Sequence, residues 1–432
     1  MKIAYFSPFE PMQSGISDFS EELIVELGKS VELELFTPVY KEYKNNTFPV
    51  HSVIDYDEEA LRKTFDLAVF HIGNNYQFHI EIVEMFMKYG GVLELHDLAL
   101  HHFLVEATLQ KGDRRGYVDA MKYCHGEQGK KCAQDFLAGK RKEPWISESL
   151  QYSVNKYLLD RSSAVIVHSE YAYEFVKAIV PQKPVVSIEL HAAEIVENAE
   201  AKKQECCKRL GINPNELILG AYGNASAEKR IMQILEALSL LNKTNRNFHL
   251  YIVGKVSGID IEKEIKRLHL TDQVTITGHV SLDDFNAYIG ACDVAFNLRY
   301  PTQGESSASL ARLLGMGKTV FVTDIGSFSQ YPDDVLIKIP YGQKEIPTIH
   351  KVLAEFFKNE NVRKQYEKCA VEYAKKNCSL EKNAIVYCKV FQELCENKIL
   401  DESYEDTLLD ALFDLGLTDE KYVNQISDKI VF

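Results

Sequence analysis

The sequence of 432 residues has no long apolar run, no C-x-x-C motif and no excess of positive charge. Because no stretch of about 18 apolar residues occurs, we predict no transmembrane helix. The nine cysteines form no C-x-x-C pair, which argues against a zinc or thioredoxin-type site and favours reduced structural thiols in a cytosolic protein. Lysine and arginine number 49 against 63 aspartates and glutamates, and the net charge of −14 argues against nonspecific binding to nucleic acid.

Short apolar runs alternate with helical patterns along most of the chain. Such alternation predicts parallel sheets with helices on both faces. The strands are expected at 2–7, 31–36, 67–71, 91–95, 164–168, 185–190, 218–222, 248–253, 274–277, 294–298, 319–322 and 335–339. We therefore predict an α/β protein with two doubly wound halves, whose ligands bind beyond the carboxyl ends of the strands.

The same pattern divides the chain into domains. An N-terminal Rossmann-like domain is expected over residues 1–195, with a helical insertion at about 98–160 that includes a helix at 145–159. A polar, charged stretch then marks the linker, and a second Rossmann-like domain is expected over 196–378. Residues 379–432 are expected to form C-terminal helices and an acidic tail that pack back on the first domain.

The loop after the first strand contains Gly15 and leads into a helix expected at 17–28. Ser17 or Asp18 is the expected N-cap of this helix. Its first backbone amides could contact a ligand, because a helix N-terminus attracts anions. A plain turn with a helix cap is the alternative.

His96 directly follows a predicted buried strand, so its imidazole is expected to reach the ligand-binding edge. There it can donate a hydrogen bond to a sugar hydroxyl. A structural histidine is one alternative, and a metal site shared with Asp97, His101 and His102 is another. For His101 and His102 we favour a position on a helix surface. Ser169, after a later strand, is expected to cap the next helix.

In the second half, Gly223 follows a strand and permits close approach of a ligand to the backbone. Lys229 and Arg230 stand at an expected helix start, where cations gain nothing from the helix dipole. An anion such as a diphosphate at this point would account for them. Two solvated surface cations are the alternative.

Arg299 also follows a strand and precedes a helix expected at 306–316. The amides of Ser306 and Ser307 at the start of that helix suit phosphate oxygens. The carboxylate of Glu305 suits sugar hydroxyls, with a simple first-turn acidic residue as the alternative.

In their order and spacing, these segments resemble the family 4 retaining glycosyltransferases (glycosyl transferases group 1) up to about Asn397. The resemblance rests on the Gly15 loop, His96-Asp97, Val167-His168-Ser169-Glu170, Leu190-His191-Ala192, Gly223 with Lys229-Arg230, Val253-Gly254, Gly278-His279-Val280 and the block from Arg299 to Ser307. It implies the GT-B fold of two facing Rossmann-like domains.

The resemblance also implies roles for single residues. His96, Lys229 and Glu305 would be catalytic, with His96 near the reacting carbon of the donor sugar. The donor would be held by Gly15, Gly223, Lys229, Arg230, Gly254, His279, Arg299, Gly304, Glu305, Ser306 and Ser307. No metal and no cofactor is expected, since the nucleotide sugar is a co-substrate.

The sequence departs from the family pattern at the E-x7-E element. Gly304 stands at the first glutamate position and Arg312 at the second, and Glu305 is displaced by one residue. Asn224 stands where many members carry a diphosphate-binding arginine. We interpret these departures as variation within the family rather than inactivation.

The resemblance implies a retaining, metal-independent hexosyltransferase. It would move a hexose from a UDP- or GDP-linked donor to a hydroxyl of a glycan, glycolipid or protein-linked acceptor, in cell-surface polysaccharide or glycoconjugate biosynthesis. A non-catalytic GT-B partner subunit of a glycosyltransferase complex and a GT-B nucleotide-sugar epimerase are the alternatives. We expect a cytoplasmic protein without a nucleic-acid partner; peripheral contact with the inner face of the membrane and oligomerisation stay open.

Overall fold

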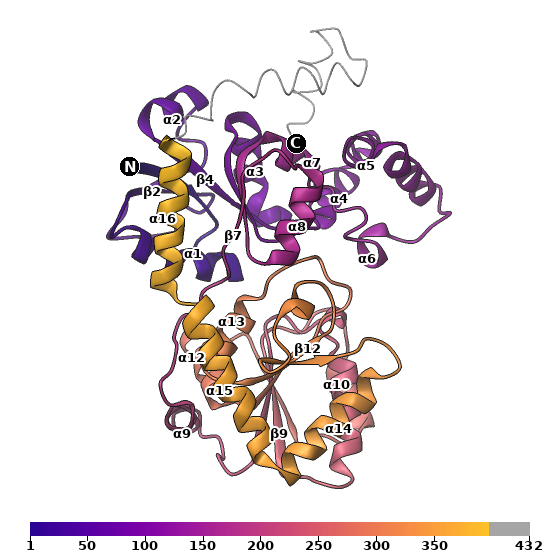
Figure 1. The fold of residues 1–432 in the computed structure, drawn as a ribbon. Coiled ribbons are helices and arrows are strands. Elements are labelled where there is room, and N and C mark those ends of the chain that lie inside the picture. Colours follow the sequence, from indigo (N-terminus) through magenta and orange to yellow (C-terminus); the bar gives the residue numbers. More distant parts are fainter. Residues whose placement is uncertain (397–432) are drawn as a thin grey trace. The chain divides into compact units, whose positions relative to one another are not determined.

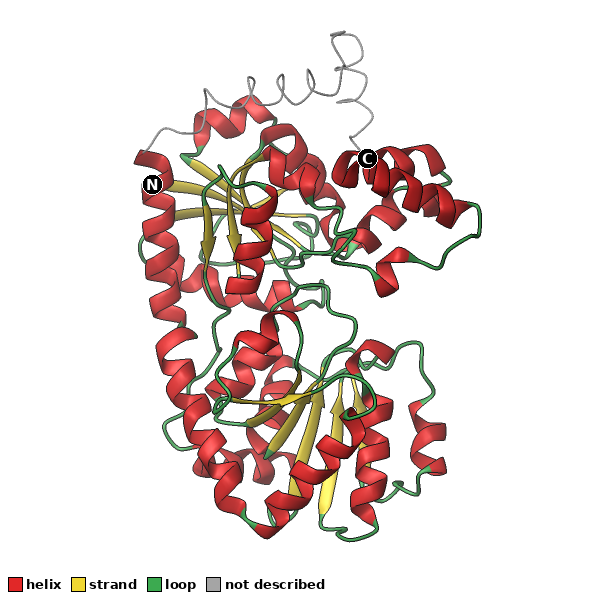
Figure 2. Cartoon of the chain, turned by 45° about the vertical axis from the view of Figure 1, so that its right-hand side comes forward, coloured by secondary structure: helices red, strands yellow, loops and turns green. Residues whose placement is uncertain are grey.

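The computed structural model describes residues 1–396, which divide into two units (Figure 1). The first unit contains Met1–Glu189, Gln303–Ser306 and the described residues from Glu381 onward, and the second contains Leu190–Thr302 and Ser307–Leu380. In both units, helices lie on both sides of a sheet (Figure 2). The predicted fold class, two doubly wound parallel-sheet domains, is confirmed.

The sheet of the first unit has seven strands in the order β3-β2-β1-β4-β5-β6-β7, and all its neighbours pair in parallel. The strands are β1 (Lys2–Phe6), β2 (Glu32–Thr37), β3 (Val50–Ser52), β4 (Leu67–Ile72), β5 (Gly91–Leu95), β6 (Ser162–Val167) and β7 (Val185–Ser187). The helices are α1 (Gly15–Leu27), α2 (Glu58–Thr64), α3 (Tyr76–Tyr89), α4 (His101–Ala107), α5 (Arg114–Leu137), α6 (Pro144–Ser147), α7 (Lys156–Arg161) and α8 (Glu170–Ile179).

The sheet of the second unit has six parallel strands in the order β10-β9-β8-β11-β12-β13. The strands are β8 (Leu217–Tyr222), β9 (Phe248–Val253), β10 (Val274–Gly278), β11 (Val294–Asn297), β12 (Thr319–Thr323) and β13 (Leu336–Ile339). The helices are α9 (Ala199–Leu210), α10 (Ile231–Asn242), α11 (Ile261–Arg267), α12 (Leu282–Ala291), α13 (Ala308–Gly315), α14 (Glu345–Lys358) and α15 (Glu360–Asn377).

The sequences of the central strands are continuous apolar runs because helices cover both faces of these strands. All six residues of β4 are buried, and in β1 the ring of Phe6 stacks between those of Phe36 and Phe70 at centroid distances of 4.5 and 4.3 Å. Strand β3 had no counterpart in the sequence prediction, because its three residues include a single apolar one, Val50, and give no apolar run.

The strand orders place one topological switch point in each sheet. In the first unit, the chain continues from β1 to strands on one side of the sheet and from β4 to strands on the other side. In the second unit, the same reversal occurs between β8 and β11. In open α/β sheets, ligands bind at the carboxyl ends of such strands. The Gly15 loop follows β1, Gly223 follows β8 and Arg299 follows β11, so these residues lie beside switch points.

The domain boundary lies earlier than the predicted position at residue 195. The N-terminal segment of the first unit ends at Glu189, and the residues from Leu190 on belong to the second unit. The amide of Ala192 donates to the carbonyl of Cys378 at 2.9 Å, and the amide of Val196 donates to Gly315 at 2.9 Å. These two hydrogen bonds attach the linker to the second unit.

The predicted helix at 145–159 is wrong. The segment contains only the short helices α6 and α7, separated by irregular backbone in which Val154 has a φ of 56°. The amide of Leu100 donates to the carbonyl of Ser153 at 2.8 Å, so contacts with the rest of the insertion replace the helical hydrogen bonds. The remaining helices between β5 and β6 occupy the segment where the helical insertion was expected.

Helix starts also differ from the prediction at two sites. Helix α1 begins at Gly15 rather than 17, and its N-cap is Ser14, whose hydroxyl accepts a hydrogen bond from the amide of Ser17 at 3.1 Å. Helix α13 begins at Ala308 rather than 306. The predicted cap of α8 is confirmed, because Ser169 Oγ accepts from the amide of Ala172.

The last described helix, α16 (Leu380–Glu396), belongs to the first unit from Glu381 on and is the yellow helix of Figure 1. The side-chain Nδ2 of Asn383 donates to the carbonyl of Glu189 at 2.6 Å. Within residues 1–396, no helix is both long and apolar enough to cross a membrane. The predicted acidic tail beyond residue 396 lies outside the described residues.

Candidate active site

In the first unit, four polar side chains meet at the carboxyl ends of neighbouring strands; we call them the histidine cluster. His71 belongs to β4 and Glu94 to β5, while His96 and His168 directly follow β5 and β6. His71 and Glu94 have no exposed surface, His168 is 4% exposed and His96 is partly buried. Such buried polar groups are costly unless they satisfy one another.

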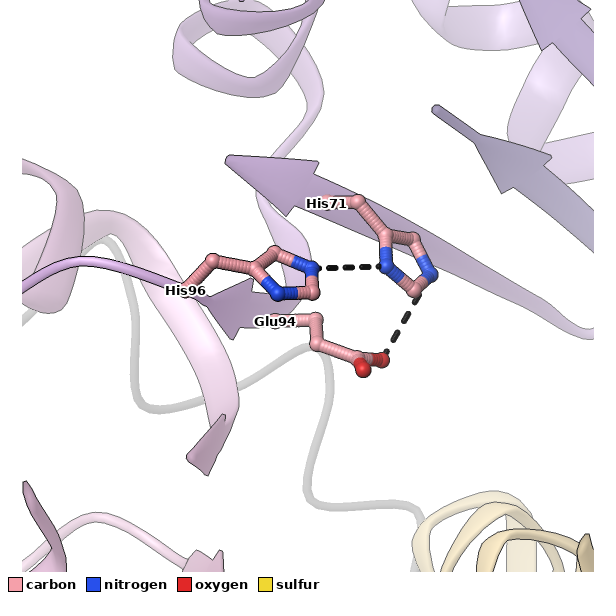
Figure 3. A group of neighbouring side chains, drawn as sticks. All are labelled: His71, Glu94 and His96. Atoms are coloured by element: carbon pink, nitrogen blue, oxygen red, sulfur yellow. Dashed lines mark hydrogen bonds and ion pairs between the residues drawn. The ribbon is translucent and has the colours of Figure 1, made fainter. Parts of the chain in front are cut away.

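Polar contacts connect the cluster, and Figure 3 draws three of its members, His71, Glu94 and His96. His71 Nδ1 and His96 Nε2 share a hydrogen bond of 3.1 Å. On the other side of the same ring, His71 Nε2 lies 3.4 Å from Glu94 Oε2. Glu94 Oε1 lies 3.6 Å from His168 Nε2. The carboxyl group of Glu94 therefore lies between two imidazoles.

A fifth residue comes from the C-terminal helix. The hydroxyl of Tyr387 in α16 donates a hydrogen bond of 2.6 Å to Glu94 Oε1, and both side chains are buried. A tyrosine 293 residues away in sequence thereby fixes one oxygen of the carboxyl group.

Burial dominates the electrostatics of the cluster. It raises the pKa of Glu94 to about 8, against the opposing effect of the hydrogen bond from Tyr387. Burial, followed by repulsion from His168, lowers the pKa values of His71 and His96 well below the ordinary range. His96 is consequently a neutral imidazole near pH 7 and can be a hydrogen-bond donor without carrying charge.

Aromatic rings and a carboxylate shape the surroundings of His96. The ring of Phe19 from α1 meets His96 edge-on at a centroid distance of 5.5 Å. The carboxylate of Asp97 accepts a hydrogen bond from the backbone amide of Asn74 at 2.8 Å and stabilises the turn after β4. It does not form a metal site together with His96.

The predicted surface position of His101 is wrong. His101 is fully buried in the helical insertion, where Nδ1 lies 3.0 Å from the carbonyl of Tyr152 and Nε2 lies 2.8 Å from the hydroxyl of Tyr117. Both ring nitrogens are used by these partners, so the alternative metal site of His96, Asp97, His101 and His102 is not assembled. His102 is partly buried.

In the second unit, three glycine loops lie together at the carboxyl ends of β8, β9 and β10. The amide of Gly223 donates to the carbonyl of Val253, and the amide of Gly254 donates to Gly278, both at 2.9 Å. All three glycines have positive φ values, and a Cβ on Gly254 would lie 2.1 Å from the Gly223 carbonyl oxygen. Only glycine permits this packing. His279 follows Gly278 and is exposed.

Lys229 and Arg230 differ in their surroundings. Lys229 Nζ lies 3.9 Å from the position that a Cβ on Gly223 would occupy, so the ammonium group stands over the loop after β8. Arg230 is engaged by the buried Glu345 of α14, with Nε to Oε1 at 3.0 Å and Nη2 to Oε2 at 2.6 Å. This pairing raises the pKa of Arg230 and binds its guanidinium to the protein.

Arg299 lies beside the N-terminus of α13. Its Nη2 donates to the hydroxyl of Ser307 at 3.1 Å, and Ser307 caps the helix by accepting from the amide of Leu310 at 3.3 Å. A cation and a helix N-terminus thus lie together in the second unit, which is the arrangement expected to attract an anion.

Residues 303–306, between β11 and α13, group with the first unit. The amide of Ala99 donates to the carbonyl of Gln303 at 3.0 Å. Gly304 has a φ of 74° and packs on Leu98, and the nearly buried Glu305 accepts from the amide of Gln303 at 2.7 Å. The Glu305 carboxylate is thereby oriented by its own loop.

Ser306 belongs to the same loop, and its hydroxyl donates to the carbonyl of His168 at 2.9 Å. The two positions that depart from the family pattern also have structural partners. Arg312 is buried on α13 and its Nη1 lies 3.4 Å from Asn286 Oδ1. Asn224 Oδ1 accepts from the hydroxyl of Ser257 at 2.7 Å.

Two residues of the histidine cluster and the tyrosine that contacts it were not predicted from the sequence. His71 and Glu94 lie inside apolar strands, where a single polar residue gives no signal of its own, and Tyr387 lies on an amphipathic helix. His96 was recognised because it comes directly after a strand. The useful signal would have been the polar residue within each of two adjacent buried strands.

Residues 202–376 match the family model described as "Glycosyl transferases group 1". An uncharacterized glycosyltransferase of Methanocaldococcus jannaschii is 23% identical over 181 residues, which cover 42% of this chain and 46% of that protein. The chain thus spans about half the length of this curated relative.

Solved structures share the fold over most of both chains. Sucrose-phosphate synthase from Thermosynechococcus elongatus has a TM-score of 0.65 at 14% identity, covering 92% of this chain and 100% of that one. Anabaena HepE in complex with UDP-glucose has a TM-score of 0.60 at 12% identity, covering 91% and 100%. The comparisons therefore show a glycosyl transferases group 1 match at residues 202–376 and a fold of two parallel-sheet domains that the chain shares with these glycosyltransferase structures.

Proposed function

We propose that this chain is a retaining hexosyltransferase, which moves a hexose from a UDP- or GDP-linked donor to a hydroxyl of a glycan, glycolipid or protein-linked acceptor. One observation carries the proposal: the region that matches the family model brings Lys229 over the glycine loop after β8, beside a switch point. We place the reaction in the synthesis of cell-surface polysaccharide or glycoconjugate. A cytoplasmic location is part of the proposal, since all nine cysteines are free thiols.

In the proposed reaction, the chain stabilises the departing nucleoside diphosphate with fixed positive charge. Lys229 would contact the phosphates across Gly223, whose lack of a side chain permits close approach. Arg299 and the N-terminus of α13 would add a second electropositive point. We assign Arg230 a supporting role, because its guanidinium is bound to Glu345. No metal is needed in this scheme.

The first unit would position the sugar. His96 is neutral and partly buried, so it would donate a hydrogen bond to the donor sugar without adding charge near a carbon that becomes positive. Glu305, held by the amide of Gln303, would accept hydrogen bonds from sugar hydroxyls. In a retaining reaction, the leaving phosphate would take the proton of the acceptor hydroxyl. Water must be excluded during this step, or the donor would be hydrolysed.

The deciding experiment is a nucleotide-sugar hydrolysis screen that needs no acceptor. Because the HepE structure holds UDP-glucose, UDP-glucose is the first donor to test, and release of UDP is the readout. Loss of the charge-assisted hydrogen bond in Lys229→Ala should weaken UDP binding about 10- to 100-fold. The matched control is Lys243→Ala, an exposed lysine at the far end of α10.

Each result decides between the proposal and its alternatives. Unchanged UDP binding and transfer in Lys229→Ala would refute the diphosphate site. Protein that neither binds nor hydrolyses any UDP- or GDP-sugar would favour a non-catalytic partner subunit. Conversion of the donor to another nucleotide sugar, instead of its hydrolysis, would favour an epimerase. Retention is read from the anomeric configuration of the first product by NMR.

A further inference from the structure

A continuous series of polar contacts runs from the C-terminal helix to His96. Tyr387 donates to Glu94 Oε1 at 2.6 Å, Glu94 Oε2 lies 3.4 Å from His71 Nε2, and His71 Nδ1 lies 3.1 Å from His96 Nε2. Tyr387, Glu94 and His71 are buried, and His96 alone is partly accessible. The role proposed for His96 leaves the other three residues without a function.

We propose that Glu94 is a positioning residue, which acts through His71 to fix which ring nitrogen of His96 carries the proton, while Tyr387 holds the carboxyl group in place. The proposal rests on the proposed function for the use that is made of His96. The chain of contacts itself belongs to the first unit and does not depend on that use.

The argument follows from the donors and acceptors of a neutral imidazole, which has one N–H and one lone pair. The 3.4 Å contact between Glu94 Oε2 and His71 Nε2 is a polar contact and not a hydrogen bond, so Glu94 acts on His71 through its charge. If Glu94 is protonated, its O–H faces a lone pair on His71 Nε2, His71 Nδ1 donates to His96 Nε2, and the proton of His96 is on Nδ1. If Glu94 is ionised, its negative charge favours a proton on His71 Nε2, the hydrogen bond between the two histidines reverses, and the proton of His96 is on Nε2. The state of one buried carboxyl group therefore decides whether the free side of His96 offers a donor or an acceptor.

The surroundings favour the protonated carboxyl group. His168 Nδ1 lies 2.9 Å from the carbonyl of Ile188, which can only accept, so the proton of a neutral His168 is on Nδ1. Its other nitrogen then directs a lone pair toward Glu94 Oε1 at 3.6 Å. A lone pair that faces a buried carboxyl group favours its protonated form, and because Oε1 accepts the hydrogen bond from Tyr387, the proton is expected on Oε2, the oxygen next to His71.

The titratable groups around Glu94 agree with this state. They are Tyr5 of β1, His71 of β4, His79 of α3, His96, His168 and Tyr387 of α16. Burial raises the pKa of Glu94 to about 8 and lowers that of His79 to about 4, so near pH 7 the carboxyl group is protonated and His79 is neutral. His96 then offers an N–H group, which suits the oxygen of a sugar hydroxyl.

A bound metal is the competing explanation of the same residues. One ligand atom each from His71, Glu94 and His96 can be chosen so that all lie within 4.8 Å of one another, as a small divalent cation would require. A metal would take lone pairs from both histidines, whereas a single shared proton already accounts for the 3.1 Å contact between them. Metal in stoichiometric amount would overturn the proposal, and elemental analysis of the purified full-length protein measures it.

The direct test is NMR of protein with ¹⁵N-labelled histidines, with the His96 signals assigned from a His96→Gln variant. In the wild type we expect the His96 proton on Nδ1 at pH 6.5 and on Nε2 at pH 9.5. In Glu94→Gln the side chain stays uncharged at both pH values, and Tyr387 keeps the oxygen of the new amide on its side, so an NH₂ group faces His71 and His96 should keep its proton on Nδ1 at both pH values. A tautomer of His96 that is the same in both proteins at both pH values would overturn the proposal.

Tyr387→Phe gives a second, independent test. The hydrogen bond from Tyr387 lowers the pKa of Glu94, so its loss should move the midpoint of the His96 change to higher pH. The matched control is Tyr117→Phe, which removes a buried tyrosine–histidine hydrogen bond of 2.8 Å in the helical insertion and should leave the midpoint unchanged. Equal midpoints in Tyr387→Phe and wild type, with both folded, would contradict the assigned role of Tyr387.

Turnover separates this proposal from the proposed function. For an active wild type, kcat should fall above about pH 8 as His96 loses its donor, while Glu94→Gln should keep kcat there, with KM changed less than kcat. Parallel pH profiles of the two proteins would overturn the link to catalysis. If no donor is turned over, the proposed function fails, but the NMR comparison still decides the role of Glu94.

Discussion

The burial of Glu94 predicts how the stability of the first unit depends on pH. Its pKa is about 8 in the fold against an ordinary value of 4.5, so the folded state holds a proton that the unfolded chain releases. The stabilisation by this proton is fully present below about pH 4.5, declines as the pH rises, and is lost above about pH 8. One proton corresponds to about 1.4 kcal/mol per pH unit, or on the order of 5 kcal/mol over the whole interval.

Glu94→Gln removes this dependence while keeping the shape and the hydrogen bond from Tyr387. The difference in unfolding free energy between Glu94→Gln and wild type should therefore increase in favour of the variant by about 3 kcal/mol between pH 5.5 and 8, and then level off. Titration of the histidines contributes equally to both proteins and cancels in the difference.

Urea unfolding followed by tryptophan fluorescence measures this difference in unfolding free energy for the first unit, which contains the tryptophan. Trp145 is the single tryptophan and packs against His101 and Phe136 in the helical insertion of the first unit. Glu127→Gln, at an exposed position on α5, serves as the control and should change stability little at every pH. A wild-type-to-variant difference that stays constant from pH 5.5 to 8 would refute the reasoning.

Three further changes test the site and its supports. Gly304→Ala should destabilise the protein by about 1–3 kcal/mol in urea titrations, because φ is 74° and the new Cβ would lie 2.6 Å from Leu98; unchanged stability would contradict the packing. Glu345→Ala should cost about 3–5 kcal/mol and lower the melting temperature, since it leaves the partly buried Arg230 unpaired, whereas UDP affinity measured by calorimetry should not fall; a loss of affinity instead of stability would assign the pair to binding. Ser14→Ala should cost about 1 kcal/mol in the same titrations through the lost cap of α1, and a null effect would show that the cap is not needed.

The fold could be predicted well because its signal is local. Strands covered on both faces must be apolar throughout, as the six buried residues of β4 are, and such runs are visible in sequence. The prediction of a helix at 145–159 was wrong because the apolar side chains of this segment pack inside an insertion with irregular backbone, in which Val154 has a positive φ. Periodicity alone does not distinguish these two reasons for apolar residues.

The candidate site was predictable only where position along a strand carries information. Gly15, His96 and Gly223 follow strands, and the structure places each at a carboxyl edge. Arg230 pairs with Glu345, which lies 115 residues away in sequence, and no sequence pattern near either residue predicts this ion pair. The structure thus adds a partner of Arg230 that the sequence did not predict, and its contact with the donor diphosphate stays a prediction.

The hydrogen bond between Tyr387 and Glu94 has a consequence for the order in which the chain folds during synthesis. Although the first unit begins at Met1, its buried carboxyl group receives its tyrosine donor only after residue 387 has left the ribosome. The second unit ends at Leu380 and can be complete before that moment. We therefore expect the first unit to reach its final state after the second unit, which reverses the usual vectorial order.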